Sequence, residues 1–144
     1  MTRPPTALEA ATAALARRDR PAAGLVAYLE RRGVAGDEAR AAVARLRDAG
    51  YVDDARYAER RAEVLAERGY GDEGIRFELL RDGVAAAEAT VAVAALPPER
   101  ERAAALLREA ADPSATARRL LAKGFAPEAL EAGRGRDGPA PPDP

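Results

Sequence analysis

Side chains that perform most enzymatic chemistry are scarce in this sequence. Its 144 residues contain no Cys and no His, which excludes disulfide frameworks, thiolate zinc sites, cysteine nucleophiles and the Ser-His-Asp triad. Ser114 is the only serine, and its place after Asp112 and Pro113 is typical of the first turn of a helix. We therefore expect no catalytic site, no cofactor and no metal, and a protein that is not an enzyme.

Two short motifs suggest ligand binding, but their surroundings oppose it. Residues 69–74 match the G-x-G-x-x-G pattern of dinucleotide-binding loops, yet a helix is predicted before them where that fold needs a strand. Asp72 and Glu73 lie inside the pattern and would repel phosphate. Asp53 and Asp54 could form a metal-binding pair, but no loop-ligand spacing accompanies them. We predict an interhelical loop at residues 69–74 and a helix N-cap at the aspartate pair.

Arginine doublets are the strongest candidates for a binding role. They occur at residues 17–18, 31–32, 60–61 and 118–119. A cation near a helix C-terminus interacts favourably with the helix dipole, which explains the first two doublets without any partner. The functional interpretation is contact with an acidic protein surface or with phosphate groups.

The charge distribution favours a protein partner over a nucleic acid. Residues 1–50 carry a net charge of +3 and residues 51–98 a net charge of −4, whereas the whole chain is at −1 with a pI of about 5.7. Strong nucleic-acid binders usually have a pI above about 9, so we expect any DNA contact to be weak or indirect. Charge and position give these candidate partner-binding residues: Arg17, Arg18, Arg31, Arg32, Tyr57, Arg61, Arg76, Arg81, Arg118, Arg119 and Lys123.

The amino-acid composition and the positions of Pro and Gly predict an all-α fold. Alanine, the best helix former, occurs 38 times, while Val and Ile together occur 9 times. Pro and Gly divide the chain into helices expected over residues 6–18, 21–31, 37–49, 55–67, 75–81, 86–95, 99–111, 113–123 and 127–132. Asp37 is the expected N-cap of the third helix, and Asp112 that of the eighth.

A recurring helix end predicts an array of repeats. Three helices close on a glycine that has a leucine four residues before it and an apolar residue directly after it. The closing glycines are Gly33, Gly83 and Gly124. A glycine there allows the left-handed turn that ends a helix, and the apolar residue packs back on the leucine. A period of about 40–50 residues is typical of stacked helical repeats that form an elongated molecule.

The middle of the chain resembles the RecX family of recombination regulators. The resemblance lies in the stretch G-Y-V-D-D-A-R-Y-A at residues 50–58, the glycine loop at residues 68–71, and the segment from Arg76 to Gly83 and Val84. Arg76 and Glu78 are one residue closer together than in the family pattern. Weaker likeness extends over residues 6–131.

The resemblance implies three tandem three-helix repeats that bind the RecA recombinase, especially its filament on single-stranded DNA. The family modulates, and usually inhibits, strand exchange, ATP hydrolysis and coprotease activity in DNA repair and the SOS response. We expect a flexible N-terminus at residues 1–5, repeats at residues 6–50, 51–97 and 98–132, the last one truncated, and a disordered Gly/Pro-rich tail at residues 133–144.

Three further expectations concern context. The sequence has no run of about 18 apolar residues and no signal-peptide pattern, so we expect a cytoplasmic protein without a membrane span. The protein is expected to be a monomer. Two alternatives remain open: a protein that binds DNA directly through three-helix units, and a generic helical scaffold for protein interactions.

Overall fold

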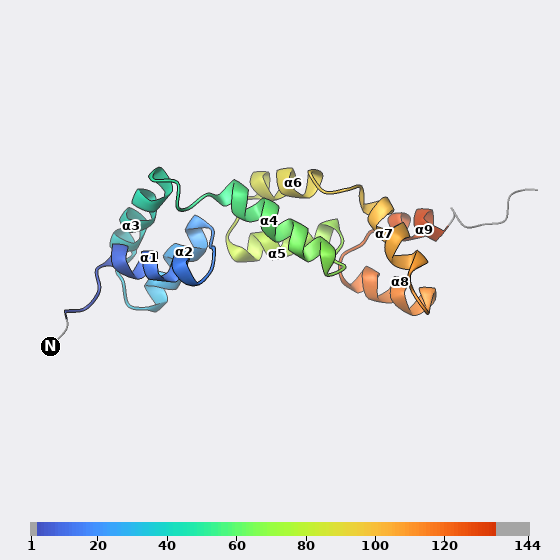
Figure 1. Ribbon diagram of the computed structural model, residues 1–144, viewed down its shortest axis with the longest axis horizontal. Coiled ribbons are helices and arrows are strands. Elements are labelled where there is room, and N and C mark those ends of the chain that lie inside the picture. The colour runs from blue at the N-terminus through green and yellow to red at the C-terminus, as the bar shows by residue number, and fades with distance from the viewer. Residues whose placement is uncertain (1–2, 135–144) are drawn as a thin grey trace, which may run out of the picture.

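The computed structural model describes residues 3–134 and contains nine helices and no strand within that range (Figure 1). They are α1 (Ala7–Arg17), α2 (Ala22–Arg31), α3 (Gly36–Asp48), α4 (Asp54–Glu67), α5 (Asp72–Asp82), α6 (Ala86–Ala94), α7 (Glu99–Arg108), α8 (Pro113–Ala122) and α9 (Pro127–Arg134). The predicted all-α class is confirmed for the described residues.

Most helix ends follow the signals in the sequence, but α5 begins at Asp72, so residues 72–74 of the predicted interhelical loop are helical. Gly83 has a φ of 103°, and the N–H of Val84 returns to the Leu79 carbonyl at 3.0 Å, which is the left-handed closing turn expected there. Asp53 and Asp112 cap α4 and α8 through their side chains, as predicted. The prediction that Asp37 caps α3 is wrong. The helix begins one residue earlier, and Asp37 lies in its first turn, where its carboxylate still favours the positive end of the dipole.

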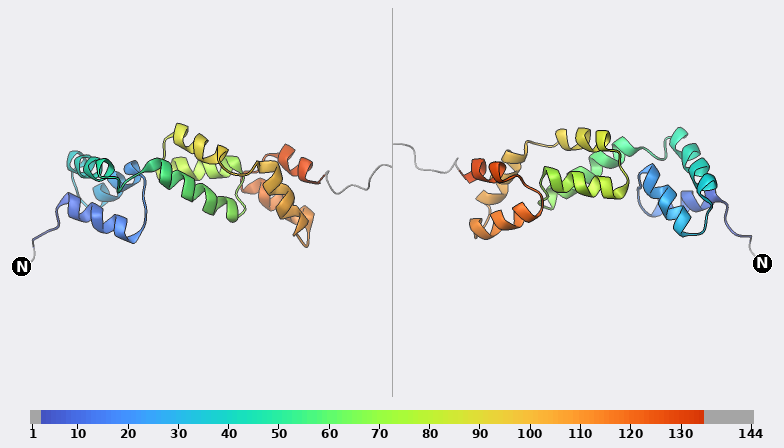
Figure 2. Two further views of the ribbon diagram at one scale, coloured as in Figure 1. Left: turned by 45° about the horizontal axis from the view of Figure 1, so that its top comes forward. Right: turned by 180° about the vertical axis from the view of Figure 1, so that it is seen from behind.

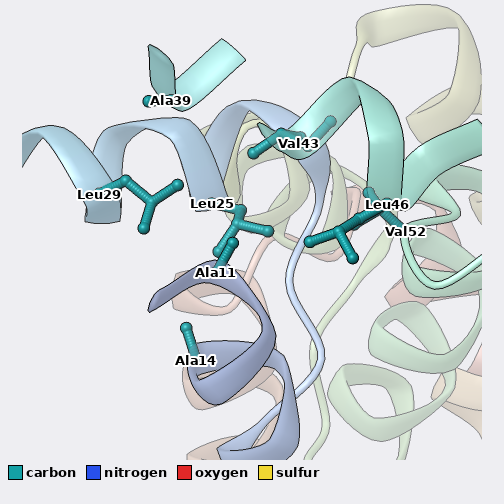
Figure 3. Packing of buried hydrophobic residues seen from close by; sticks show 9 residues of the cluster. Ala11, Ala14, Leu25, Leu29, Ala39, Val43, Leu46 and Val52 are labelled. Carbon is teal, nitrogen blue, oxygen red and sulfur yellow. The ribbon is translucent and has the colours of Figure 1, made fainter. Parts of the chain in front are cut away.

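The nine helices form three groups of three, and each group has its own buried cluster. The helix pairs with extensive contacts all lie within α1–α3, α4–α6 or α7–α9. Figure 3 shows the first cluster, in which alanines of α1 face the buried leucines of α2 and apolar residues of α3. Leu25 and Leu29 are fully buried there, and burying each leucine contributes about 1.5–3 kcal/mol. Alanine lets the helices approach closely, so a few leucines suffice for each core.

The three groups follow one another in a row and make the molecule elongated (Figures 1 and 2). The N-terminal group lies at one end and α7–α9 at the other, with α4–α6 between them. Within the described residues, no helix is long and apolar enough to cross a membrane.

The last helix is longer than the sequence indicates. Helix α9 continues to Arg134 rather than ending at residue 132. Gly133 is buried against α7, where an added Cβ would lie 3.1 Å from the Ala104 nitrogen. A missing side chain, normally a sign of a loop, here permits close helix packing. Residues 135–144 of the expected tail, and residues 1–2, lie outside the described part of the chain.

Candidate protein-interaction surface

Carboxylates at equivalent positions join consecutive groups. The Ala22 N–H, at the start of α2, donates to Asp54 Oδ1 at 2.7 Å. The Asp72 N–H, at the start of α5, donates to Glu99 Oε1 at 2.9 Å. Asp54 and Glu99 are the first residues of α4 and α7. In both cases a carboxylate of the next group accepts a hydrogen bond from the N–H at the start of the second helix of a group. That N–H has no acceptor within its own helix.

Glycines allow the same helix ends to touch the following group. Gly24 and Gly74 are each the third residue of their helix, α2 and α5. A Cβ at Gly24 would lie 2.8 Å from the Asp82 carbonyl oxygen at the end of α5, and one at Gly74 would overlap the Lys123 carbonyl at the end of α8. The positive end of one helix dipole thus meets the negative end of the next, which is favourable. Figure 2 (right) shows α2, α5 and α8 following one another along this face.

A groove at the junction of the first two groups collects several candidate binding residues. It has a volume of about 430 Å³ and is lined by the predicted residues Arg18, Arg31, Tyr57 and Arg81. Arg20 and Asp82 line it as well. The structure therefore brings together residues from α2, α4, α5 and the segment between α1 and α2 that are up to 64 positions apart in the sequence.

Asp82 is paired with side chains of α4, in its own helix group, and so does not balance the positive charge of the groove. Its Oδ2 accepts a hydrogen bond from the Tyr57 hydroxyl at 2.8 Å and another from Arg61 Nε at 3.2 Å. Burial, followed by this bond to the carboxylate, raises the pKa of Tyr57 to about 12. Tyr57 and Arg61, both predicted to bind a partner, thus first serve to hold α4 against α5.

The arginines of the groove have little local compensation. Among the described residues, Arg18, Arg20 and Arg31 form no ion pair, and Arg81 has only a 3.8 Å contact with Glu78. The Arg20 guanidinium lies 4.1 Å from the Tyr28 ring centroid, and its buried Nε lacks a hydrogen-bond partner. Desolvation, followed by the charge of Arg18, lowers the pKa of Arg20. The groove is therefore suited to an anionic ligand.

The arginine doublets do not act as units. Arg17 and Arg32 line a different hollow of about 590 Å³ beside the N-terminal segment. Arg32 is held there by the Tyr28 hydroxyl, which its NH2 group contacts at 2.7 Å. This hydrogen bond is also the main reason that the pKa of Tyr28 is lowered. Arg18 and Arg31, their sequence neighbours, face the groove instead.

The remaining candidates are spread along the molecule. Arg76 pairs with Glu73 on its own helix. Lys123 Nζ donates to the Arg68 carbonyl at 2.8 Å and so caps the C-terminal end of α4. Arg118 and Arg119 are exposed on α8. These residues are not part of the groove between the first two groups.

The roles of several residues were not predicted from the sequence. Arg20 has no doublet partner, and only the fold brings it into the groove. Arg102, whose side chain is 10% exposed, binds Asp72 Oδ1 at 2.8 Å and the Tyr70 carbonyl at 3.1 Å, locking the second junction. A signal for Asp54 and Glu99 does exist in the sequence, because each carboxylate lies at the start of the first helix of its group.

No metal centre is visible in the part of the chain that the structure describes, where no three Asp, Glu, Cys or His residues cluster suitably. The aspartate pair that could bind a metal has other partners. Asp53 accepts from the Arg56 N–H at 3.0 Å, and Asp54 caps α2.

Comparison with known proteins gives two relatives in Stenotrophomonas maltophilia, both named Regulatory protein RecX. The chain is 39% identical over 79 residues to that of strain R551-3, a match covering 55% of this chain and 48% of the relative. It is 36% identical over 88 residues to that of strain K279a, covering 61% and 54%. The matches thus span about half the length of the curated relatives. No protein-family model matches the chain.

Solved structures extend the similarity along most of the chain. The crystal structure of RecX from Lactobacillus salivarius matches with a TM-score of 0.79, covering 90% of this chain and 93% of that one at 18% identity. A second crystal structure, of regulatory protein RecX, matches with a TM-score of 0.75, covering 90% and 71% at 20% identity. The resemblance indicated by the sequence is therefore confirmed: this chain is a relative of the RecX regulatory proteins and has the RecX fold.

Proposed function

We propose that this chain is a non-enzymatic regulator that binds the RecA recombinase, or its filament on single-stranded DNA. It modulates, and chiefly inhibits, the recombinase, ATPase and coprotease activities of RecA. It therefore acts in DNA recombination, DNA repair and the SOS response. Its place of action is the cytoplasm, and its working form is a monomer. The observation that carries the proposal is the similarity in sequence to proteins named Regulatory protein RecX, together with the shared fold.

The architecture supports this function if the groups are tandem repeats. We propose repeats at residues 6–50, 51–97 and 98–132, joined by the equivalent carboxylate caps of Asp54 and Glu99. Burial supports the equivalence: from residue 23 to residue 30 the pattern of buried and exposed positions is the same as from residue 73 to residue 80. An elongated array presents many separate contacts along a helical polymer such as a filament. Helix α9 supports a contribution from the third repeat, because it packs closely on α7 despite being short.

The groove between the first two groups is the part of this surface that we assign to the partner. The arginines of the groove would contact acidic side chains of RecA. Such charge complementarity orients the two proteins during their encounter and raises the association rate. Phosphate groups of DNA would fit the same charges, so direct DNA binding is the second candidate function. The net charge of −1 over the chain favours the protein partner.

A binding measurement tests the proposal. The chain has no cysteine, so Ala111→Cys, in the exposed loop between α7 and α8, provides one labelling site. Fluorescence anisotropy of the labelled chain is followed as RecA filaments on single-stranded DNA are added, and separately as the DNA alone is added. Saturable binding to filaments with weak binding to free DNA is expected. Binding to DNA alone with equal affinity would favour the second candidate, and no binding to filaments would refute the first.

A pair of charge reversals tests the groove. Arg31→Glu is expected to weaken filament binding by at least about tenfold, because it places a negative charge among the remaining arginines of the groove. Arg45→Glu makes the same charge change on the exposed surface of α3, outside the groove, and is expected to have little effect. Equal losses from the two variants would show that only net charge matters.

A further inference from the structure

Helix α5 is apolar on its outer side as well as on its inner side. Ile75 and Leu79 are fully buried in the core, but Phe77 is 64% exposed and Leu80 is 45% exposed. The chain has only two phenylalanines, and the other one, Phe125, is 3% exposed. A helix with apolar residues on both sides is normally covered on both sides. The outer side of α5 is therefore unusual for a free surface.

The equivalent helix of the first group lacks this feature. At the positions corresponding to Phe77 and Leu80, helix α2 exposes Ala27 and Glu30. Fold maintenance therefore does not require large apolar residues at these positions. Their presence on α5 adds exposed apolar area without strengthening the core.

Arginines flank the two exposed apolar residues. Phe77 and Leu80 are three residues apart and share one side of the helix, while Arg81 follows Phe77 by four residues and Arg76 precedes Leu80 by four. Arg81 also lines the basic groove, so the apolar side of α5 continues directly into it. We call Phe77, Leu80, Arg76 and Arg81 the α5 face.

We propose that the α5 face docks an acidic segment of the protein partner that also carries apolar side chains. The apolar side chains cover Phe77 and Leu80, and carboxylates of the segment reach Arg81 and the neighbouring groove. The proposal rests on the proposed function and names where, and by what chemistry, the partner binds.

Two considerations favour a protein over DNA as the occupant. A DNA backbone offers phosphates to the arginines but nothing comparable to cover Leu80. Aromatic side chains and arginine are the residues enriched at the energetic centres of protein interfaces. The α5 face combines an aromatic ring, a leucine and two arginines within six residues.

The test compares three variants in the filament-binding assay with the labelled chain. Phe77→Ala with Leu80→Ala removes the apolar part of the α5 face. Val91→Ala on α6 removes another exposed apolar side chain, one that is 70% exposed and lies outside the face. Exposed truncations of this kind change stability little, and thermal unfolding followed by circular dichroism verifies this. Arg81→Glu tests the acidic character of the segment.

The expected result is a loss of filament affinity of at least about tenfold for the double variant, since truncating a central aromatic typically has such an effect. Val91→Ala stays within about twofold of the wild type. Arg81→Glu weakens binding strongly at low salt and less at high salt, because screening reduces the charge contribution.

Three other results would overturn the proposal in distinguishable ways. If the wild type binds filaments well and the double variant binds equally well, the α5 face is not the docking site, and the proposed function is unaffected. An equal loss of affinity for single-stranded DNA without RecA identifies base stacking on Phe77 instead of a protein contact. No filament binding by the wild type refutes the proposed function and this inference together.

Discussion

Replacing Asp54 by alanine removes the bond that joins the first group to the second. The Asp54 side chain accepts a hydrogen bond from the Ala22 N–H at 2.7 Å, and the N-cap residue of α2, Pro21, provides no side-chain cap of its own. Losing a side-chain cap usually costs about 1 kcal/mol, within a range of roughly 0.5–2. Asp54 also lies in the first turn of α4, where a carboxylate contributes about 0.3–1 kcal/mol through the dipole.

A matched control separates the two contributions. Glu101 lies in the first turn of α7 and is exposed, and its side chain forms no ion pair with another described residue. Glu101→Ala therefore loses only the dipole contribution. We expect Asp54→Ala to lower the free energy of unfolding by about 1 kcal/mol more than Glu101→Ala. For a chain of this size the additional loss corresponds to roughly 4 °C in Tm.

Urea unfolding followed by circular dichroism gives the stability difference, and amide hydrogen exchange gives its location. The Ala22 amide is expected to exchange faster in Asp54→Ala than in the wild type, because its acceptor is gone. Asp54→Asn keeps a side-chain oxygen as acceptor and should recover much of the protection. Asp54→Ala with the stability of Glu101→Ala, or with unchanged exchange at Ala22, would refute the role of this carboxylate as a junction.

Two other predictions concern the junctions and the tyrosine beside the groove. Gly74→Ala is expected to destabilise the chain by about 1–3 kcal/mol, because the added methyl overlaps the Lys123 carbonyl. Gly36→Ala, whose methyl meets only the flexible side-chain ends of Arg40 and Glu30, should be neutral or stabilising in the same urea unfolding experiment; equal effects would contradict the close approach. Because the pKa of Tyr57 is raised from the usual tyrosine value of 10.0 to about 12 in the folded chain, its contribution to stability is complete below pH 10 and lost as the pH rises to 12. The stability difference between the wild type and Tyr57→Phe should therefore shrink over that interval, and a constant difference would show that Tyr57 ionises normally.

Local signals in the sequence were sufficient to predict most helices. Glycine followed by an apolar residue marks a helix end at Gly33, Gly83 and Gly124, and all three adopt positive φ. These signals act within a few residues and therefore survive without knowledge of the fold. The error at Asp37 arises because the neighbouring Gly36 is itself helical, so the acidic residue belongs to the first turn rather than to the cap.

The junctions and the groove could not be predicted in the same way. The contact of Asp54 with Ala22 joins residues 32 positions apart, and periodicity within a helix contains no information about it. Adjacent arginines near a helix end point in different directions, since successive residues are about 100° apart around a helix. Arg31 and Arg32 accordingly line different hollows, although the sequence suggested one contact.

The measurement that tests the central claim most directly is ATP hydrolysis by RecA on single-stranded DNA, titrated with this protein from far below stoichiometric amounts. A regulator of the filament is expected to produce a saturable, dose-dependent fall in hydrolysis, with no hydrolysis by the protein alone. An unchanged rate at concentrations where circular dichroism shows the protein folded would contradict the claim that it regulates RecA.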